Sequence, residues 1–299
     1  MKIIRYDSFG EDDEMEPESM EEAPVMIPRS RRYCGRFVRP LIQLYSVHIM
    51  NFTGNIYGTI RVQDTAMLQD LYIRERDESE PICPTHNELL MIGPDVAMSA
   101  RGDFAIFVDL IYKDTDLPLV KDGLLTGTMP WYIVFRDAVE AAVEVKLIIR
   151  DGEDPSHVYG RITACNSYFA EEVLLFRKRS NEHIDVRSGQ IIPLSRFVVT
   201  VPVLSLLIVR ADLWNYSAIS SDAIAKGTAE FSFPVELRGT FEKRICGQCS
   251  QIQVKASARS DLTASQSISR TTDNRSYWDE ESFCWVTFQQ RSKSMERAG

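Results

Sequence analysis

The stretch Tyr57-Gly58-Thr59-Ile60-Arg61 decides the fold, because a second copy follows as Tyr159-Gly160-Arg161-Ile162-Thr163. An alternating strand pattern precedes each copy, and an apolar patch ending in arginine follows it. The patches are Leu71–Arg74 and Leu174–Arg177. A nearly constant offset between several pairs of landmarks predicts an internal repeat. Its period is far too long for a solenoid, so we expect two related units.

Further landmarks in the two copies correspond in the same order. Each copy continues with an apolar turn and closes on a long apolar strand that runs into an aspartate. The turns are Leu90–Pro94 and Gln190–Leu194, and the closing strands are Phe104–Asp114 and Val203–Asp212. The repeat therefore extends well beyond the Tyr-Gly pairs.

Period-two alternation of apolar residues predicts strands through most of the chain. Val139–Arg150 contains Ala and Glu, which favour a helix, but its apolar residues keep a period of two and predict a strand. Residues 75–87 are charged and predict a loop, and Trp131–Phe135 begins the second unit. Short strands separated by turn signals are typical of sandwiches and barrels. We predict an all-β protein made of two related antiparallel β-sandwich-like units packed together.

Composition divides the chain into four segments. An acidic block, Glu11–Glu22, precedes a block of arginines, and neither holds enough apolar residues to offset the entropy of ordering. After residue 260, Ser, Thr and Arg dominate. We expect a disordered acidic/basic tail over 1–39, a first β unit over 40–127, a second over 128–259 and a mostly disordered tail over 260–299.

Charge, cysteine content and the length of the apolar runs argue against a nucleic-acid-binding, a disulfide-rich and a membrane-spanning protein. The chain has 299 residues and a formal net charge of −9. Residues 1–23 hold nine acidic and two basic residues, so the folded part is nearly neutral and shows no electrostatic footprint for nucleic acid. Six cysteines are too sparse for a disulfide scaffold. The longest apolar run, Phe197–Val209, is too short for a membrane span. We expect a soluble, intracellular protein, cytoplasmic or nuclear.

The ordered set of landmarks resembles domain-of-unknown-function family 6598, an uncharacterised plant family expanded in cereal grasses. The resemblance covers about residues 40–258. The matching stretches are Val47-His48-Ile49, Tyr57–Asp64, Tyr72-Ile73-Arg74, Leu90–Pro94, Phe104–Leu110, Val143–Val145, Asp151-Gly152, Tyr159–Ala164, Val173–Leu175, Pro193–Arg196, Val198-Val199 and Cys249–Val254. The resemblance implies a β fold, a plant origin and a stress- or defence-related setting, and it implies no reaction.

Some members of that family carry a ribosome-inactivating domain beside this one. Its active-site helix has an arginine soon after a glutamate, in a Glu-x-x-Arg pattern. The nearest stretch here, Val139–Glu144, lacks that arginine. The resemblance therefore does not extend to N-glycosidase activity.

Cys246 and Cys249 are weak candidates for metal binding. A Cys-x-x-Cys pair supplies half of a zinc site, or a redox dithiol where it opens a helix. Zinc requires two more ligands, and no second pair accompanies this one, because the other cysteines are isolated: Cys34, Cys83, Cys165 and Cys284. No helix is predicted after the motif. An inert hairpin or a hairpin disulfide is the favoured interpretation.

Two groups of acidic residues are candidates for calcium binding, which requires convergent carboxylate oxygens. Acidic residues are also common in solvated turns. The groups are Asp109, Asp114, Asp116 and Asp122, then Asp151, Glu153 and Asp154. The four histidines have no metal-site or catalytic spacing and are interpreted as surface or core residues: His48, His86, His157 and His183.

The sequence indicates no catalytic residue and no cofactor. We therefore expect a non-enzymatic interaction or regulatory domain with a protein partner. One alternative is a hydrolase that acts on carbohydrate or nucleic acid with loop carboxylates, which a deep pocket holding a carboxylate pair would favour. Another alternative is a calcium-dependent membrane-docking module.

Overall fold

The structure is a computed structural model, and the part described here comprises residues 38–49, 52–64, 67–101, 104–119, 128–149, 155–216, 221–233, 239–248 and 250–259. Both predicted tails, apart from residues 38 and 39, lie outside these residues. Within them the chain forms antiparallel strands and two short 3₁₀ turns, η1 (Arg76–Glu78) and η2 (Ser180–Glu182). The predicted all-β class is confirmed. No helix in the described part is long and apolar enough to span a membrane.

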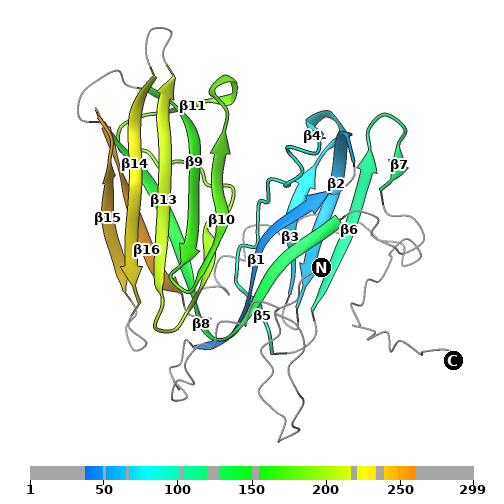
Figure 1. Cartoon of the computed structure of the whole chain (residues 1–299), viewed down its shortest axis with the longest axis horizontal. Coiled ribbons are helices and arrows are strands. Elements are labelled where there is room, and N and C mark those ends of the chain that lie inside the picture. Colours follow the sequence, from blue (N-terminus) through cyan, green and yellow to red (C-terminus); the bar gives the residue numbers. More distant parts are fainter. Residues whose placement is uncertain are drawn as a thin grey trace, which may run out of the picture.

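Three sheets build the two units, which lie side by side in Figure 1. The first unit has the sheet β3 (Leu68–Arg74), β2 (Gly54–Gln63), β6 (Ala105–Tyr112) and β7 (Leu117–Pro118), with β4 (Glu80–Ile82) also on β2. The second has β10 (Phe169–Lys178), β9 (Ser156–Asn166), β13 (Leu206–Tyr216) and β14 (Ser221–Ser232), with β11 (Ile184–Val186) also on β9. The third sheet contains β15 (Thr240–Cys246), β16 (Ser250–Arg259), β8 (Thr128–Ile149), β1 (Arg39–Ile49) and β5 (Met98–Ser99), with β12 (Val198–Pro202) also on β8.

The two Tyr-Gly glycines have the same structure, which confirms the repeat. Gly58 and Gly160 both have a φ of +121°, a conformation that side chains rarely adopt. A Cβ on Gly58 would lie 2.1 Å from the carbonyl oxygen of Asp109, and a Cβ on Gly160 would lie 2.1 Å from that of Asp212. Each glycine therefore lets a neighbouring strand approach closely at the same point of its unit.

One detail of the repeat differs from the correspondence expected from the sequence. In the first unit Thr59 lies opposite Ile73, and in the second unit its counterpart Arg161 lies opposite Arg177. Ile73 therefore corresponds to Arg177, one residue further than the aligned patches place it. The connection between β9 and β10 is shorter than that between β2 and β3, while β10 is longer than β3, so the offset changes along this hairpin.

Strand β8 belongs to both units. Its first half pairs with β1, from Thr128 opposite Ile49 to Ala138 opposite Arg39. Its second half pairs with β16 and β12. The sequence indicated two separate segments here, Trp131–Phe135 and Val139–Arg150. The structure joins them into one strand, with a bulge near Arg136 that places one more residue on β8 than on β1.

The sheet around β1 is covered on both faces. Ile42 and Leu44 pack in the core of the first unit, whereas Leu41 and Tyr45 pack in the core of the second. This explains why residues 41–47 are all buried, since alternate side chains enter different cores. The two units are thus packed against opposite faces of a shared sheet.

Buried polar groups of the second unit also form hydrogen bonds with β1. The Arg196 guanidinium donates to the carbonyl oxygens of Tyr45 (3.1 Å) and Leu44 (2.6 Å). Burial lowers the pKa of Arg196 to about 10. Thr200 donates its backbone N–H to Gln43 Oε1 at 2.7 Å. These bonds connect buried polar groups of the second unit to buried polar groups of β1.

Candidate functional site

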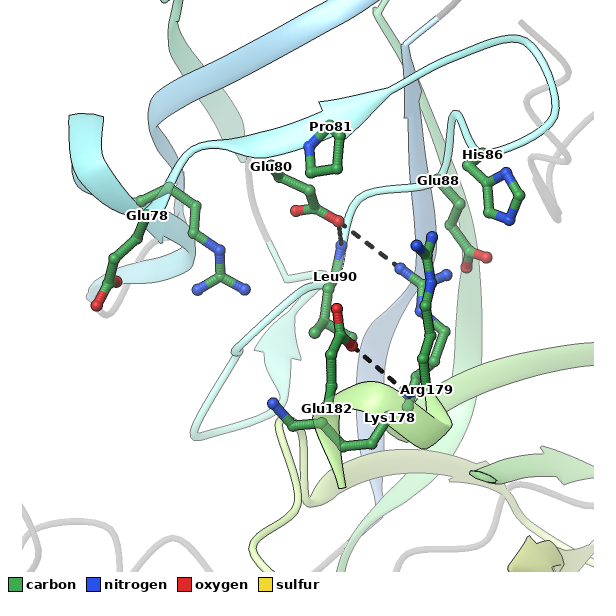
Figure 2. A pocket seen from close by; sticks show the side chains of 11 residues that line it. Glu78, Glu80, Pro81, His86, Glu88, Leu90, Lys178, Arg179 and Glu182 are labelled. Atoms are coloured by element: carbon green, nitrogen blue, oxygen red, sulfur yellow. Dashed lines mark hydrogen bonds and ion pairs between the residues drawn. The ribbon is translucent and has the colours of Figure 1, made fainter. Parts of the chain in front are cut away.

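A cleft of about 210 Å³ lies where the two units meet. The first unit contributes η1, β4 and the turn that follows it, and the second contributes the end of β10 and η2 (Figure 2). Its lining consists of Arg74, Glu78, Glu80, Pro81, His86, Glu88, Leu90, Arg177, Lys178, Arg179 and Glu182. Only Pro81 and Leu90 are apolar, so the cleft is a charged site.

The two walls of the cleft carry opposite charge. The wall from the first unit holds three glutamates and one arginine, and the wall from the second holds three basic residues and one glutamate. With His86 neutral, the walls have net charges of −2 and +2. This separation is invisible in composition, because the two walls cancel.

One ion pair crosses the cleft. Arg177 Nη2 lies 3.7 Å from Glu80 Oε1, which also accepts a hydrogen bond from the backbone N–H of Leu90 at 3.3 Å (Figure 2). Burial raises the pKa of Glu80. Its other oxygen, Oε2, and the hydroxyl of Tyr72 are both buried, and the two side chains shift each other's pKa. Burial, and then the charge of Glu80, raises the pKa of Tyr72.

The other basic groups of the cleft have few partners. Arg74 donates to the carbonyl oxygen of Ile73, and its guanidinium lies 5.5 Å from the centre of the Tyr72 ring. No described residue forms an ion pair with Lys178 or Arg179. The second wall therefore presents cations that the described part of the protein leaves unpaired.

A reactive thiol lies beside the cleft. Cys83 and His86 close a turn, with Cys83 Sγ 3.2 Å from Thr85 Oγ1 and 3.7 Å from His86 Nδ1. Hydrogen bonding to Thr85 and then to His86 lowers the pKa of the Cys83 thiol to about 7. A lowered pKa favours the thiolate, which is the nucleophilic form of cysteine.

The predicted cysteine pair is only partly described. Cys246 ends β15 with an exposed side chain, and its Sγ lies 3.7 Å from Gln251 Oε1. Cys249 lies outside the described residues. Metal binding by Cys246 and Cys249 stays a prediction.

The predicted calcium ligands that the structure describes are engaged separately. Asp116 binds Arg76 and the Tyr57 hydroxyl, and Asp114 accepts from Tyr112. Asp109 lies within β6. Among the described residues, none of these aspartates belongs to a cluster of three or more side chains that could hold a metal ion. Asp122, Asp151, Glu153 and Asp154 lie outside the described residues, and calcium binding stays a prediction.

The cleft was not predicted from the sequence, although two of its arginines belong to the predicted repeat. Arg74 and Arg177 end the two apolar patches that define the repeat, and both line the cleft. The signal was their recurrence at the end of equivalent strands. The sequence does not show how the two units pack, and it is this packing that brings the two strand ends together.

Comparison with known proteins identifies a family and no activity. No curated protein matches the chain. A solved structure of the two C2 domains, A and B, of Extended-Synaptotagmin 2 is similar at 10% sequence identity and a TM-score of 0.23, over 82% of this chain and 98% of that one. This similarity is too low to carry an inference. The model of "Domain of unknown function (DUF6598)" matches residues 41–124 and 131–256. The chain, matched over both of its units, therefore belongs to the DUF6598 family.

Proposed function

We propose that the protein is a non-enzymatic interaction module that binds a charged segment of a partner protein in the cleft between its units. The observation that carries this proposal is the pair of oppositely charged walls joined by a single long ion pair among the described residues. Charges in a partly enclosed site interact more strongly than charges in bulk water. A segment that presents both signs would pair with both walls at once.

The size of the cleft favours a protein segment over a free small molecule. Its volume of about 210 Å³ is below the range of about 300–1,000 Å³ that is usual for small-molecule sites. One or two inserted side chains fill such a space. We infer a partner with an acidic residue that contacts Lys178 and Arg179, and a nearby basic residue that contacts Glu78 and Glu88.

The experiment is binding of the purified full chain to an array of short peptides that are acidic only, basic only or mixed in charge. We expect mixed-charge peptides to be retained and their binding to weaken as salt rises. The double variant Lys178→Glu, Arg179→Glu should abolish this retention. The matched control is Arg244→Glu, an exposed charge on β15, away from the cleft. Equal binding by both variants, or no preference for mixed charge, would reject the proposal.

A hydrolase is the second candidate, because the cleft gathers four glutamates and burial raises the pKa of Glu80. A raised pKa is typical of a general acid. Glu80, however, has one oxygen engaged by Leu90 and Arg177 and the other buried. A substrate oxygen reaches neither without rearrangement, so binding is the better-supported function.

The hydrolase is tested with defined oligosaccharides and an RNA oligonucleotide as substrates. We expect no turnover by the wild-type chain. Turnover that disappears in Glu80→Gln and persists in Arg244→Glu would favour the enzyme over the interaction module.

A further inference from the structure

Two histidines and an aspartate from separate elements meet on the surface of the second unit. His157 lies in β9, His183 directly follows η2, and Asp185 lies in β11. Asp185 is paired opposite His157, which places their side chains on one face, and His183 precedes Asp185 by two residues. One ligand atom from each lies within 4.8 Å of the others.

Hydrogen bonds fix the same tautomer on both imidazoles. His183 Nδ1 lies 2.9 Å from the carbonyl oxygen of Ser180, which only accepts, so this nitrogen carries the proton. His157 Nδ1 lies 2.6 Å from Asp185 Oδ1 and donates to that carboxylate. In the neutral form of each ring, the lone pair is therefore on Nε2. Metal-binding histidines are held in this way by a carbonyl or carboxylate at the other nitrogen.

The packing of the rings leaves the cluster ordered and open. The His157 and His183 rings meet edge to face with centroids 5.1 Å apart. His183 also stacks on Tyr216 at 4.9 Å with an interplanar angle of 11°. The His157 side chain remains 39% exposed, so an ion can reach the site from solvent.

We propose that His157 and His183 bind a divalent first-row transition metal of the zinc class through their Nε2 atoms. Imidazole nitrogen suits zinc, copper and nickel better than magnesium or calcium. Asp185 is a positioning residue that orients His157, and water completes the coordination. This binding site goes beyond the proposed function and does not depend on it.

The first unit shows what the same backbone looks like without the site. The positions that correspond to His157, His183 and Asp185 are Asn55, Ser79 and Pro81. There, Lys113 Nζ donates to Ser79 Oγ at 3.0 Å. An ammonium in that place repels a cation. The cluster is thus a specific addition to the second unit.

The test uses the tag-free full chain carrying Cys246→Ser, which removes the candidate cysteine site, and titrates it with Zn²⁺ by calorimetry. We expect one site, with affinity lowered at least about tenfold in His157→Ala and His183→Ala and by about 10- to 100-fold in Asp185→Asn. The matched control is His48→Ala, a histidine of β1 that lines neither the cleft nor the cluster, and this variant should bind as tightly as the parent.

A second readout reports the ligand atoms directly. Cu²⁺ is added to the same chain, and electron paramagnetic resonance counts the coupled nitrogens. We expect two imidazole nitrogens in the parent and one in either single histidine variant. Unchanged zinc affinity in both histidine variants, or a copper spectrum without imidazole coupling in the parent, would overturn the proposal. The parent spectrum alone can overturn the proposal, even if a variant fails to fold.

Discussion

The first and second units share a backbone and differ in chemistry. The turn Cys83–His86 after β4 and the turn Arg187–Gln190 after β11 are both closed by backbone hydrogen bonds between their end residues. The first turn carries the thiol of Cys83 and the imidazole of His86, and the second carries the guanidinium of Arg187 and the amide of Gln190. The shared backbone sets the positions of the side chains, and the sequence differences between the two units determine the chemistry at those positions.

The cleft shows the same lesson at a larger scale. Its two walls are built from equivalent segments, with Arg74 matched by Lys178 and Glu78 by Glu182. The charge difference arises at Glu80 and Glu88 in the first wall and at Arg177 and Arg179 in the second. The counterparts of Glu80 and Arg177 are the apolar residues Ile184 and Ile73. Divergence at a few equivalent positions is enough to give the walls opposite charge.

The largest effect is expected from substituting Gly58 and Gly160, the glycines of the two Tyr-Gly pairs that the units share. Gly58→Ala and Gly160→Ala each force a Cβ to 2.1 Å from a carbonyl oxygen. We expect each to lower the free energy of unfolding by about 3 kcal/mol or more, measured by urea denaturation. The control is Gly189→Ala, where the nearest neighbour of the added Cβ is 3.8 Å away. There we expect about 1–2 kcal/mol from the positive φ alone. If only one of the two substitutions had a small effect on the free energy of unfolding, the backbones of the two units would differ at this position.

The second test removes the guanidinium of Arg196, whose counterpart in the first unit is a glycine. The backbone N–H of Ile92 donates to Leu71 at 2.8 Å and that of Ser195 donates to Leu175 at 2.8 Å, so Ser195 corresponds to Ile92 and Arg196 to Gly93. Arg196→Ile removes a side-chain donor from each of two buried carbonyl oxygens of β1, of which that of Leu44 keeps a hydrogen bond from Gln43 Nε2. We expect a loss of about 2–4 kcal/mol of stability, again by urea denaturation. Arg161→Ile, at an exposed arginine, should change stability by only about 0.5 kcal/mol. Similar losses in both would mean that Arg196 does not hold the units together.

The smallest expected effect concerns the reactivity of the first unit's turn. Because hydrogen bonds lower the pKa of Cys83 to about 7, its alkylation by iodoacetamide should rise with pH and reach half its maximal rate near that pH. Thr85→Val removes the largest cause and should move the midpoint upward. Cys165, whose pKa burial raises, should stay unmodified in the folded protein. Mass spectrometry of the labelled peptides measures all of these rates, and an unmoved midpoint in Thr85→Val would contradict the assigned cause.

Local pattern was enough to predict the strands and the repeat, because alternation and the Tyr-Gly turn are properties of neighbouring residues. Strand β8 was not predicted as one element, since Arg136 and Asp137 interrupt its apolar pattern where the bulge lies. A bulge of this kind depends on the partner strand, which the sequence does not reveal.

The site could not be predicted from the sequence for a related reason. The cleft depends on how two units pack, and its opposite charges cancel in any count. His157 and His183 appeared scattered because a strand, a hairpin and η2 separate them. Only the pairing of β11 with β9 brings them together.

The sharing of β8 has a consequence for how the chain is made. During synthesis the first unit emerges before its last strand partner, because β1 pairs with residues as late as Ala138. Until that stretch leaves the ribosome, one edge of β1 is unpaired, and unpaired edges are prone to associate with other chains. The first unit therefore completes its fold only when the second unit has begun to appear. A translational pause that comes once Ala138 has left the ribosome would shelter the nascent chain better than one that comes before Thr128 has left it.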